Sequence, residues 1–127
     1  MSGTKKKQGK FWNSFRGTRK KCLRWTIICF NWKDSFVCID LDNVKDSFED
    51  VKDIITDFGE TYKEIPVSGN GVHIFAKGRI HKNINNQADR FEMYKSNKCI
   101  AMTSDVIGTC TEVQNEQYNL NLYYEKY

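Results

Sequence analysis

The fold of this chain is decided by Ser35-Phe36-Val37-Cys38-Ile39-Asp40-Leu41-Asp42-Asn43. The alternation is typical of a β-strand, because successive strand side chains point to opposite faces. One face receives Val37, Ile39 and Leu41, and the other receives Phe36, Cys38, Asp40 and Asp42. An unpaired carboxylate is costly to bury, so two on one face need a partner. We expect a divalent cation; the alternative is that Asp42 and Asn43 cap a following helix.

The flanking segments predict short strands around one helix. Residues 23–30 are β-branched and aromatic and 31–35 are turn-like, which predicts a hairpin with the strand over 36–42. Residues 44–58 carry apolar side chains at spacings of three and four and are followed by Gly59, which predicts an amphipathic helix with a glycine C-cap.

Later segments continue the strand pattern. Residues 61–67 predict a strand that Pro66 confines to a sheet edge or a strand end, and Asn70-Gly71 predicts a hairpin turn before the strand 72–77. Residues 79–90 are polar and poorly patterned. Residues 90–94 and 99–103 predict a further strand pair, whereas the tail from 113 fits a helix or a strand. We therefore expect one small α+β domain: a mainly antiparallel, RRM-like sheet with one or two helices packed on it.

Composition limits the classes of protein to consider. The chain has 127 residues, 39% of them hydrophobic and 28% charged, which fits one globular domain. No apolar run approaches the roughly 20 residues of a membrane-spanning helix, and no signal segment is recognised. The five cysteines include no C-x-x-C pair, so we expect neither a zinc site nor a disulfide framework. A cytoplasmic protein without membrane contact is the expectation.

Positive charge is concentrated at the N-terminus. Residues 1–24 carry nine Lys or Arg and no acid, whereas the remainder carries 11 basic and 16 acidic residues. We expect 1–24 to be a basic, flexible arm and 25–127 to be the core. With interleaved aromatic residues, the arm suits nucleic acid, although a merely solvated tail is an equal alternative. The expected nucleic-acid contacts are Lys5, Lys6, Lys7, Lys10, Arg16, Arg19, Lys20 and Lys21.

Two further motifs suggest phosphate chemistry. Ser68-Gly69-Asn70-Gly71, with His73 two residues on, suits close approach of a phosphate, although an ordinary hairpin with a structural histidine explains the same residues. Phe91-Glu92-Met93-Tyr94 places Glu92 and Tyr94 on one strand face. Glu92 gains significance if its strand lies beside Asp40 and Asp42, since three carboxylates can hold two divalent cations.

In order and spacing, these motifs resemble the archaeo-eukaryotic primase superfamily, most closely the primase-polymerases of phages, plasmids and other mobile elements. The resemblance covers about residues 35–105 and rests on 37–42, on Glu64 with 68–75, and on 91–94 with 100–103. It implies a short primase-polymerase-like catalytic core over residues 25–127.

The resemblance also implies roles for individual residues. Asp40, Asp42 and Glu92 correspond to the catalytic ligands of two Mg²⁺ or Mn²⁺ ions. Lys98 stands where relatives often carry Arg, and Thr103 matches a recurring threonine. The residues that correspond to nucleotide contacts are Ser68, Gly69, Gly71, His73, Lys98 and Thr103.

Three functions follow as hypotheses. The first is a DNA primase/polymerase that uses nucleoside triphosphates on a single-stranded template and works alone or with a separate replicative helicase. The second is a catalytically inactive, truncated relative that binds nucleic acid, a nucleotide or a replication partner. The third, a nickase with a His-hydrophobe-His metal site and Tyr94 as nucleophile, is disfavoured because Phe75 stands where the second histidine belongs.

Overall fold

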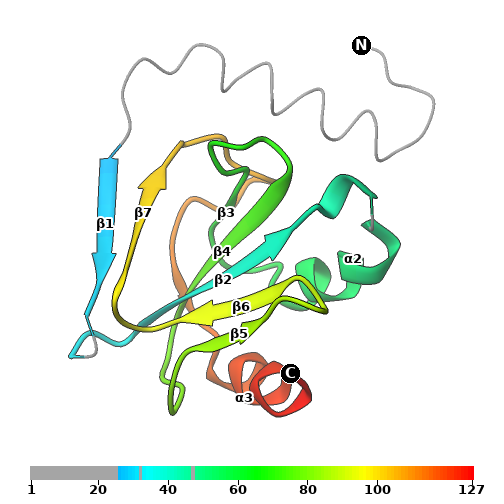
Figure 1. The fold of residues 1–127 in the computed structure, drawn as a ribbon. Helices are drawn as coiled ribbons and strands as arrows, with labels where there is room; N and C mark the ends of the chain where they lie inside the picture. The colour runs from blue at the N-terminus through cyan, green and yellow to red at the C-terminus, as the bar shows by residue number, and fades with distance from the viewer. Residues whose placement is uncertain (1–25, 32, 47) are drawn as a thin grey trace.

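The computed structural model describes residues 26–127 except 32 and 47, and Figure 1 shows their arrangement. Eleven elements follow one another in these residues: β1 (Thr26–Phe30), β2 (Phe36–Asp42), the 3₁₀ turn η1 (Val44–Asp46), α2 (Phe48–Asp57), β3 (Lys63–Glu64), β4 (Gly71–Lys77), β5 (Ile84–Asn86), β6 (Phe91–Tyr94), β7 (Lys98–Met102), β8 (Gln114–Asn115) and α3 (Gln117–Lys126). No described helix is both long and apolar enough to cross a membrane.

The strands form two sheets. The main sheet has the order β3-β4-β2-β6-β5, all antiparallel, and β8 adds a short parallel pairing to β4. The second sheet is a two-stranded antiparallel ribbon of β1 and β7, visible on one side of Figure 1. The domain is thus a small α+β fold with mostly antiparallel strands and two α-helices in its described part, which confirms the predicted fold class.

Strand β2 lies at the centre of the main sheet, and its two faces differ as its alternation predicts. Val37, Ile39 and Leu41 are buried in a large apolar core that includes side chains of α2 and α3. We call this side the rear face. Cys38 lies on the opposite, front face in a smaller apolar cluster, together with Phe30, Tyr62, Phe75 and Ile100.

Two predicted strand pairings are wrong. The strand at β1 does not form a hairpin with β2 but pairs with β7, and β6 does not pair with β7 but lies between β2 and β5. The reason is that both edges of β2 are occupied by β4 and β6, and both edges of β6 by β2 and β5. The ribbon instead packs on the front face, where the Phe30 and Phe75 rings stack 6.1 Å apart.

The expected absence of a disulfide is also wrong. Cys29 of β1 and Cys99 of β7 are direct cross-strand partners and are joined by a disulfide that spans 70 residues of sequence. Because the two cysteines lie in strands far apart along the chain, their spacing gave no sign of the pairing. Cys38 and Cys110 are free.

Other boundaries differ in smaller ways. The single helix predicted over 44–58 is divided into η1 and α2, and the strand predicted over 61–67 is reduced to β3 at the sheet edge. Strand β5 lies in residues 79–90, for which the sequence predicted no strand. The ambiguous tail contains both the short strand β8 and the helix α3.

Candidate functional site

Four polar side chains form a row across the front face of the main sheet. Asp40 of β2 is the direct partner of His73 on β4 and of Glu92 on β6, and His73 is in turn the partner of Glu64 on β3. Direct partners on neighbouring antiparallel strands lie about 5 Å apart and share one face. We call Glu64, His73, Asp40 and Glu92 the polar row. Residues up to 52 positions apart in the sequence are therefore adjacent in space.

Asp40 and His73 form the centre of the polar row. His73 Nε2 lies 3.4 Å from Asp40 Oδ1, and their side chains are only 12% and 13% exposed. The other ring nitrogen, Nδ1, is buried and has no hydrogen-bond partner among the described residues. Because Nε2 faces a carboxylate, the tautomer with its proton on Nε2 satisfies this pair best. The histidine is thereby oriented, with an N–H beside the carboxylates.

Glu92 is held by its neighbour on the same strand. The Tyr94 hydroxyl donates a hydrogen bond of 2.7 Å to Glu92 Oε1, and Glu92 is 8% exposed. Burial and then the Glu92 carboxylate raise the pKa of Tyr94, so this phenol stays protonated and keeps donating. Lys98 Nζ lies 4.6 Å from the centre of the Tyr94 ring, which brings one cation to the edge of the acidic group.

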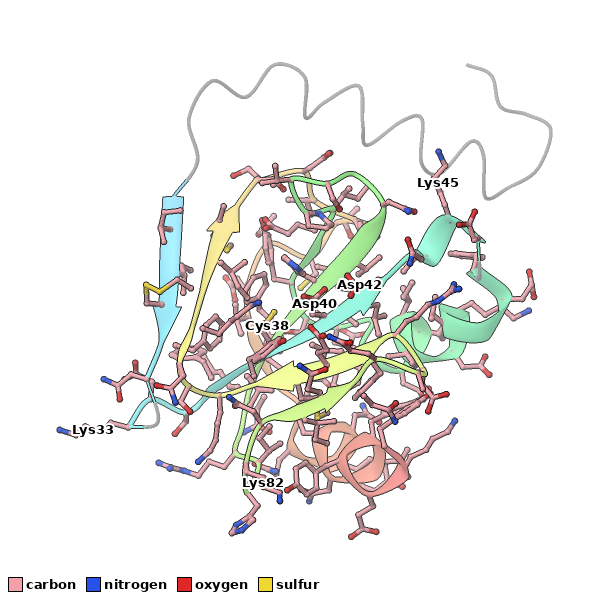
Figure 2. All side chains as sticks on the ribbon, viewed as in Figure 1. Lys33, Cys38, Asp40, Asp42, Lys45 and Lys82 are labelled. Atoms are coloured by element: carbon pink, nitrogen blue, oxygen red, sulfur yellow. A yellow bond between two sulfur atoms is a disulfide. The ribbon has the colours of Figure 1, made fainter. Side chains whose placement is uncertain are left out.

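Asp42 ends β2 on the same face as Asp40, and Figure 2 shows the two side chains as neighbours. Burial raises the pKa of Asp42, and the negative charges of Asp40 and Glu92 raise it further. His73 and Lys98 act in the opposite direction. Asp42 therefore experiences the negative charges of Asp40 and Glu92, and a further negative charge at this position is disfavoured until a cation offsets it.

The loop before β4 is fixed against the end of β2. Gly69 has a φ of 76°, which favours glycine, and its N–H donates to Pro66 O at 2.9 Å. Gly71 is opposite Asp42, and a Cβ at Gly71 would lie 2.6 Å from Leu41 O, which no side chain tolerates. Asn70 ties this loop to the turn after β2 through hydrogen bonds with Asn43 and with Lys45 N.

These contacts limit how the loop can bind an anion. The N–H groups of Gly69 and Asn70 already donate, to Pro66 O and Ser68 Oγ respectively. They therefore do not form the open anion-binding nest that two glycines can provide. Ser68 is exposed, and its hydroxyl proton is available for a phosphate oxygen. Ser68 is therefore the loop residue with an available donor, and the contacts predicted for Gly71, His73 and Lys98 stay predictions.

Thr103 and Glu64 have internal partners. The Thr103 hydroxyl donates to Ile65 O at 2.6 Å and the residue is 1% exposed. Glu64 is fully buried, and its carboxylate accepts hydrogen bonds from Tyr62 Oη, Thr103 N and Ser104 N. The structure therefore groups Thr103 with the anchor at Glu64 and not with the open carboxylates. Sequence reasoning gave Glu64 no role, because two of its donors lie about 40 positions later.

The donor set at the end of the polar row suits a hard divalent cation. Asp40, Asp42 and Glu92 supply carboxylate oxygens, the donors that Mg²⁺ and Mn²⁺ prefer, and after burial the charges of Asp40 and Glu92 are the next causes of the raised pKa of Asp42. In the part of the chain that the structure describes, no three His, Cys, Asp or Glu side chains are already arranged as a metal-binding group. The residues fit a metal chemically, and binding requires their carboxylates to turn toward each other.

The eight basic residues predicted to contact nucleic acid, from Lys5 to Lys21, lie outside the described residues. No protein-family model matches this chain, and no curated protein matches it. The assignment of a function therefore depends on the geometry of the polar row and on the sequence motifs.

Proposed function

We propose that this chain is a metal-dependent nucleotidyltransferase of the primase-polymerase type, which makes or extends primers on a single-stranded DNA template in the replication of a phage, plasmid or mobile element. The observation that carries the proposal is the pairing of Asp40 with both His73 and Glu92. The motif residues of three separate segments, named from their sequence pattern alone, are adjacent on one sheet face. If the hairpin and the glutamate were unrelated to Asp40, their pairing with this one residue would be a coincidence.

Each residue has a separate part in the proposed reaction. Asp40, Asp42 and Glu92 would hold Mg²⁺ or Mn²⁺. When bound, the metal activates the attacking 3′-hydroxyl and offsets charge on the triphosphate and the leaving pyrophosphate. His73 holds Asp40 through the N–H of Nε2 and would donate it to a phosphate oxygen once a metal took over that carboxylate, whereas the exposed hydroxyl of Ser68 can donate to a phosphate oxygen directly. Lys98 adds a point charge.

The remaining partners follow from the sequence. The proposal includes nucleoside triphosphates and a primer or template strand as substrates, with the basic residues 1–24 as contacts to the DNA backbone. A separate replicative helicase is the proposed protein partner. The alternative proposal is a binding protein without catalysis. It is favoured by one observation: Asp40 and Glu92 already have protein partners in His73 and Tyr94.

The test is incorporation of labelled nucleotides on primed and unprimed single-stranded DNA with Mn²⁺ or Mg²⁺. We expect Asp40→Ala, Asp42→Ala and Glu92→Ala each to lower incorporation by at least about 100-fold, because each removes a metal ligand. Asp34→Ala, which changes an exposed acid preceding β2, is the matched control and should retain activity. Circular dichroism establishes that each variant is folded.

Two results separate the alternatives. Full activity in an Asp40→Ala/Asp42→Ala double variant contradicts the proposed reaction. If the wild-type chain incorporates nothing but binds single-stranded DNA with a salt-dependent affinity that falls on deletion of residues 1–24, the binding protein is supported instead. The two readouts use the same full-length preparation.

A further inference from the structure

Strand β1 is attached to the rest of the domain by few contacts. Its one strand neighbour among the described residues is β7. Phe30 is its one buried described side chain, whereas Ile27 and Ile28 are 61% and 37% exposed. Apolar burial is the main force that fixes a strand on its neighbours, so β1 gains little of it and depends on its pairing with β7.

Strand β7, in contrast, is anchored independently of β1. Ile100 is buried in the front cluster, and the residues just after the strand are held by Glu64 through the N–H groups of Thr103 and Ser104. At the other end, Lys98 packs over the Tyr94 ring of the main sheet. Departure of β1 would therefore leave β7 in place.

The disulfide between Cys29 and Cys99 joins the weakly attached strand to the anchored one. Both cysteines are exposed and face each other in the register of the ribbon. A thiolate must reach one sulfur to exchange with a disulfide, and exposed disulfides are the labile ones. The bond is thus both accessible and placed where its loss has a local structural effect.

We propose that the Cys29–Cys99 disulfide is a reversible redox site that locks β1 onto β7, and that its substrate is a dithiol reductant. One thiolate of the dithiol attacks a sulfur of the pair and forms a mixed disulfide, and the second thiol resolves it. The dithiol becomes a disulfide, while Cys29 and Cys99 receive two electrons and two protons and become thiols. A disulfide oxidant such as glutathione disulfide reverses the reaction.

Release of β1 removes one wall of an apolar pocket on the front face. The pocket, about 390 Å³ in volume, lies between the ribbon and the main sheet, and three of its eight lining residues belong to β1: Ile28, Cys29 and Phe30. The other walls include Phe75 and Met102. When β1 leaves, these two side chains become accessible. Reduction of the pair thus increases the exposed apolar surface of the domain.

The other described cysteines do not compete for this role. Cys38 is fully buried, so no external thiol or disulfide reaches its sulfur in the folded domain. The Cys110 thiol donates to the carbonyl groups of Glu60 and Glu112. Only Cys29 and Cys99 form a cross-strand pair in the described residues.

The experiment uses the full-length chain with Cys22→Ser, so that every remaining cysteine lies in the described residues. Alkylation and mass spectrometry count the thiols after treatment with glutathione disulfide or dithiothreitol. Hydrogen exchange then compares both states. We expect reduction to speed exchange of residues 27–30 by about tenfold or more, with β2, β4 and β6 unchanged. Fluorescence of an apolar dye should rise in parallel.

Two variants make the result specific. Cys29→Ser should show the fast exchange under both treatments, because the lock cannot form. The matched control, Cys110→Ser, removes a cysteine outside the pair and should keep the full redox response. The proposal is overturned if the oxidised chain contains no Cys29–Cys99 link, or if reduction leaves residues 27–30 equally protected. It is also overturned if reduction exposes the main sheet as a whole, since the bond would then be a global staple.

Discussion

The two faces of the main sheet are built from the same strands but differ in the side chains they carry and in what covers them. The rear face of β2 consists of Val37, Ile39 and Leu41 and is closed by α2 and α3 into the larger core. On the front face, Asp40 and Asp42 follow Cys38 on the same strand. There the apolar cover is limited to the smaller cluster beneath the ribbon.

One alternating strand thus contributes to stability through one face and to the candidate site through the other. Burying apolar area on the rear face is favourable, whereas covering a carboxylate without a partner costs several kcal/mol in an apolar environment. The polar row therefore needs hydrogen-bonding or charged partners on the front face, where the rear face needs only apolar ones. Mutations on the rear face should change stability, whereas mutation of the exposed Asp42 should change ion binding with little cost to the fold.

The largest effect on stability is expected from a cavity on the rear face. Ile39 is fully buried, so Ile39→Ala should lower the free energy of unfolding by about 3 kcal/mol through lost burial and the cavity left behind. Urea unfolding measures the loss. The same substitution at Ile27, which is 61% exposed, is the matched control and should change stability by less than about 0.5 kcal/mol. Equal losses at both positions would contradict the assignment of the core.

The exception on the front face is Glu64, which should behave as a structural residue. Glu64→Gln replaces one acceptor oxygen with an NH₂ group that faces a donor, so we expect a loss of about 2 kcal/mol in urea unfolding. Hydrogen exchange at Thr103 and Ser104 should rise as well. Glu60→Gln, at an exposed position nearby, is the control. If both variants unfold at the same urea concentration, the three hydrogen bonds to Glu64 do not anchor the end of β7.

The smallest effect is expected at Asp42. Its pKa is raised in the folded state, so the folded chain binds this proton more tightly than the unfolded chain. Stability from this group is complete below the unfolded pKa and is lost as the pH rises through the folded pKa. Asp42→Asn should therefore stabilise the metal-free protein at pH 7, by no more than about 0.5 kcal/mol for a mostly solvated group, and should have no effect at pH 3.

Unfolding curves from pH 3 to 7 in the presence of a chelator measure this difference. Asp53→Asn, on the exposed side of α2, provides the control. Mn²⁺ should then reverse the order at pH 7 and stabilise the wild-type chain more than the Asp42→Asn variant, because the cation binds the carboxylate. A variant that is less stable than the wild type in chelator would show that Asp42 makes a favourable contact in the fold.

Local patterns in the sequence predicted the elements but not all of their partners. Alternation placed β2 and its faces, and the three-to-four spacing predicted a helix where α2 lies. The pairings of β1 and β6 were wrong because nearby segments were assumed to pair. Pairing is decided by which edges are free and by burial of Phe30 against Phe75, and both depend on contacts far apart in the sequence. Strand β5 has one apolar residue and so no detectable period.

The candidate site divides in the same way. Asp40, His73 and Glu92 were chosen from local motifs, and their proximity follows from the strand register. Glu64 received no role of its own and the Cys29–Cys99 pair was not predicted, because their partners come from remote segments. Short stretches of sequence thus predict which residues carry the chemistry, whereas the hydrogen bonds and the disulfide that hold the strands depend on pairing between remote segments.

The close approach of Gly71 to Leu41 O also restricts how this sequence can change over time. Ser68 and Asn70 can each be replaced at moderate cost, since neither position excludes a side chain. At position 71 any side chain forces the backbones of β2 and β4 apart beside Asp42. In a library randomised at residues 67, 68, 70 and 71 and selected for folding, position 71 should return glycine while the other three positions diversify. Sequence change is thereby confined to the neighbouring positions, and Gly71 preserves the spacing of β2 and β4 beside Asp42.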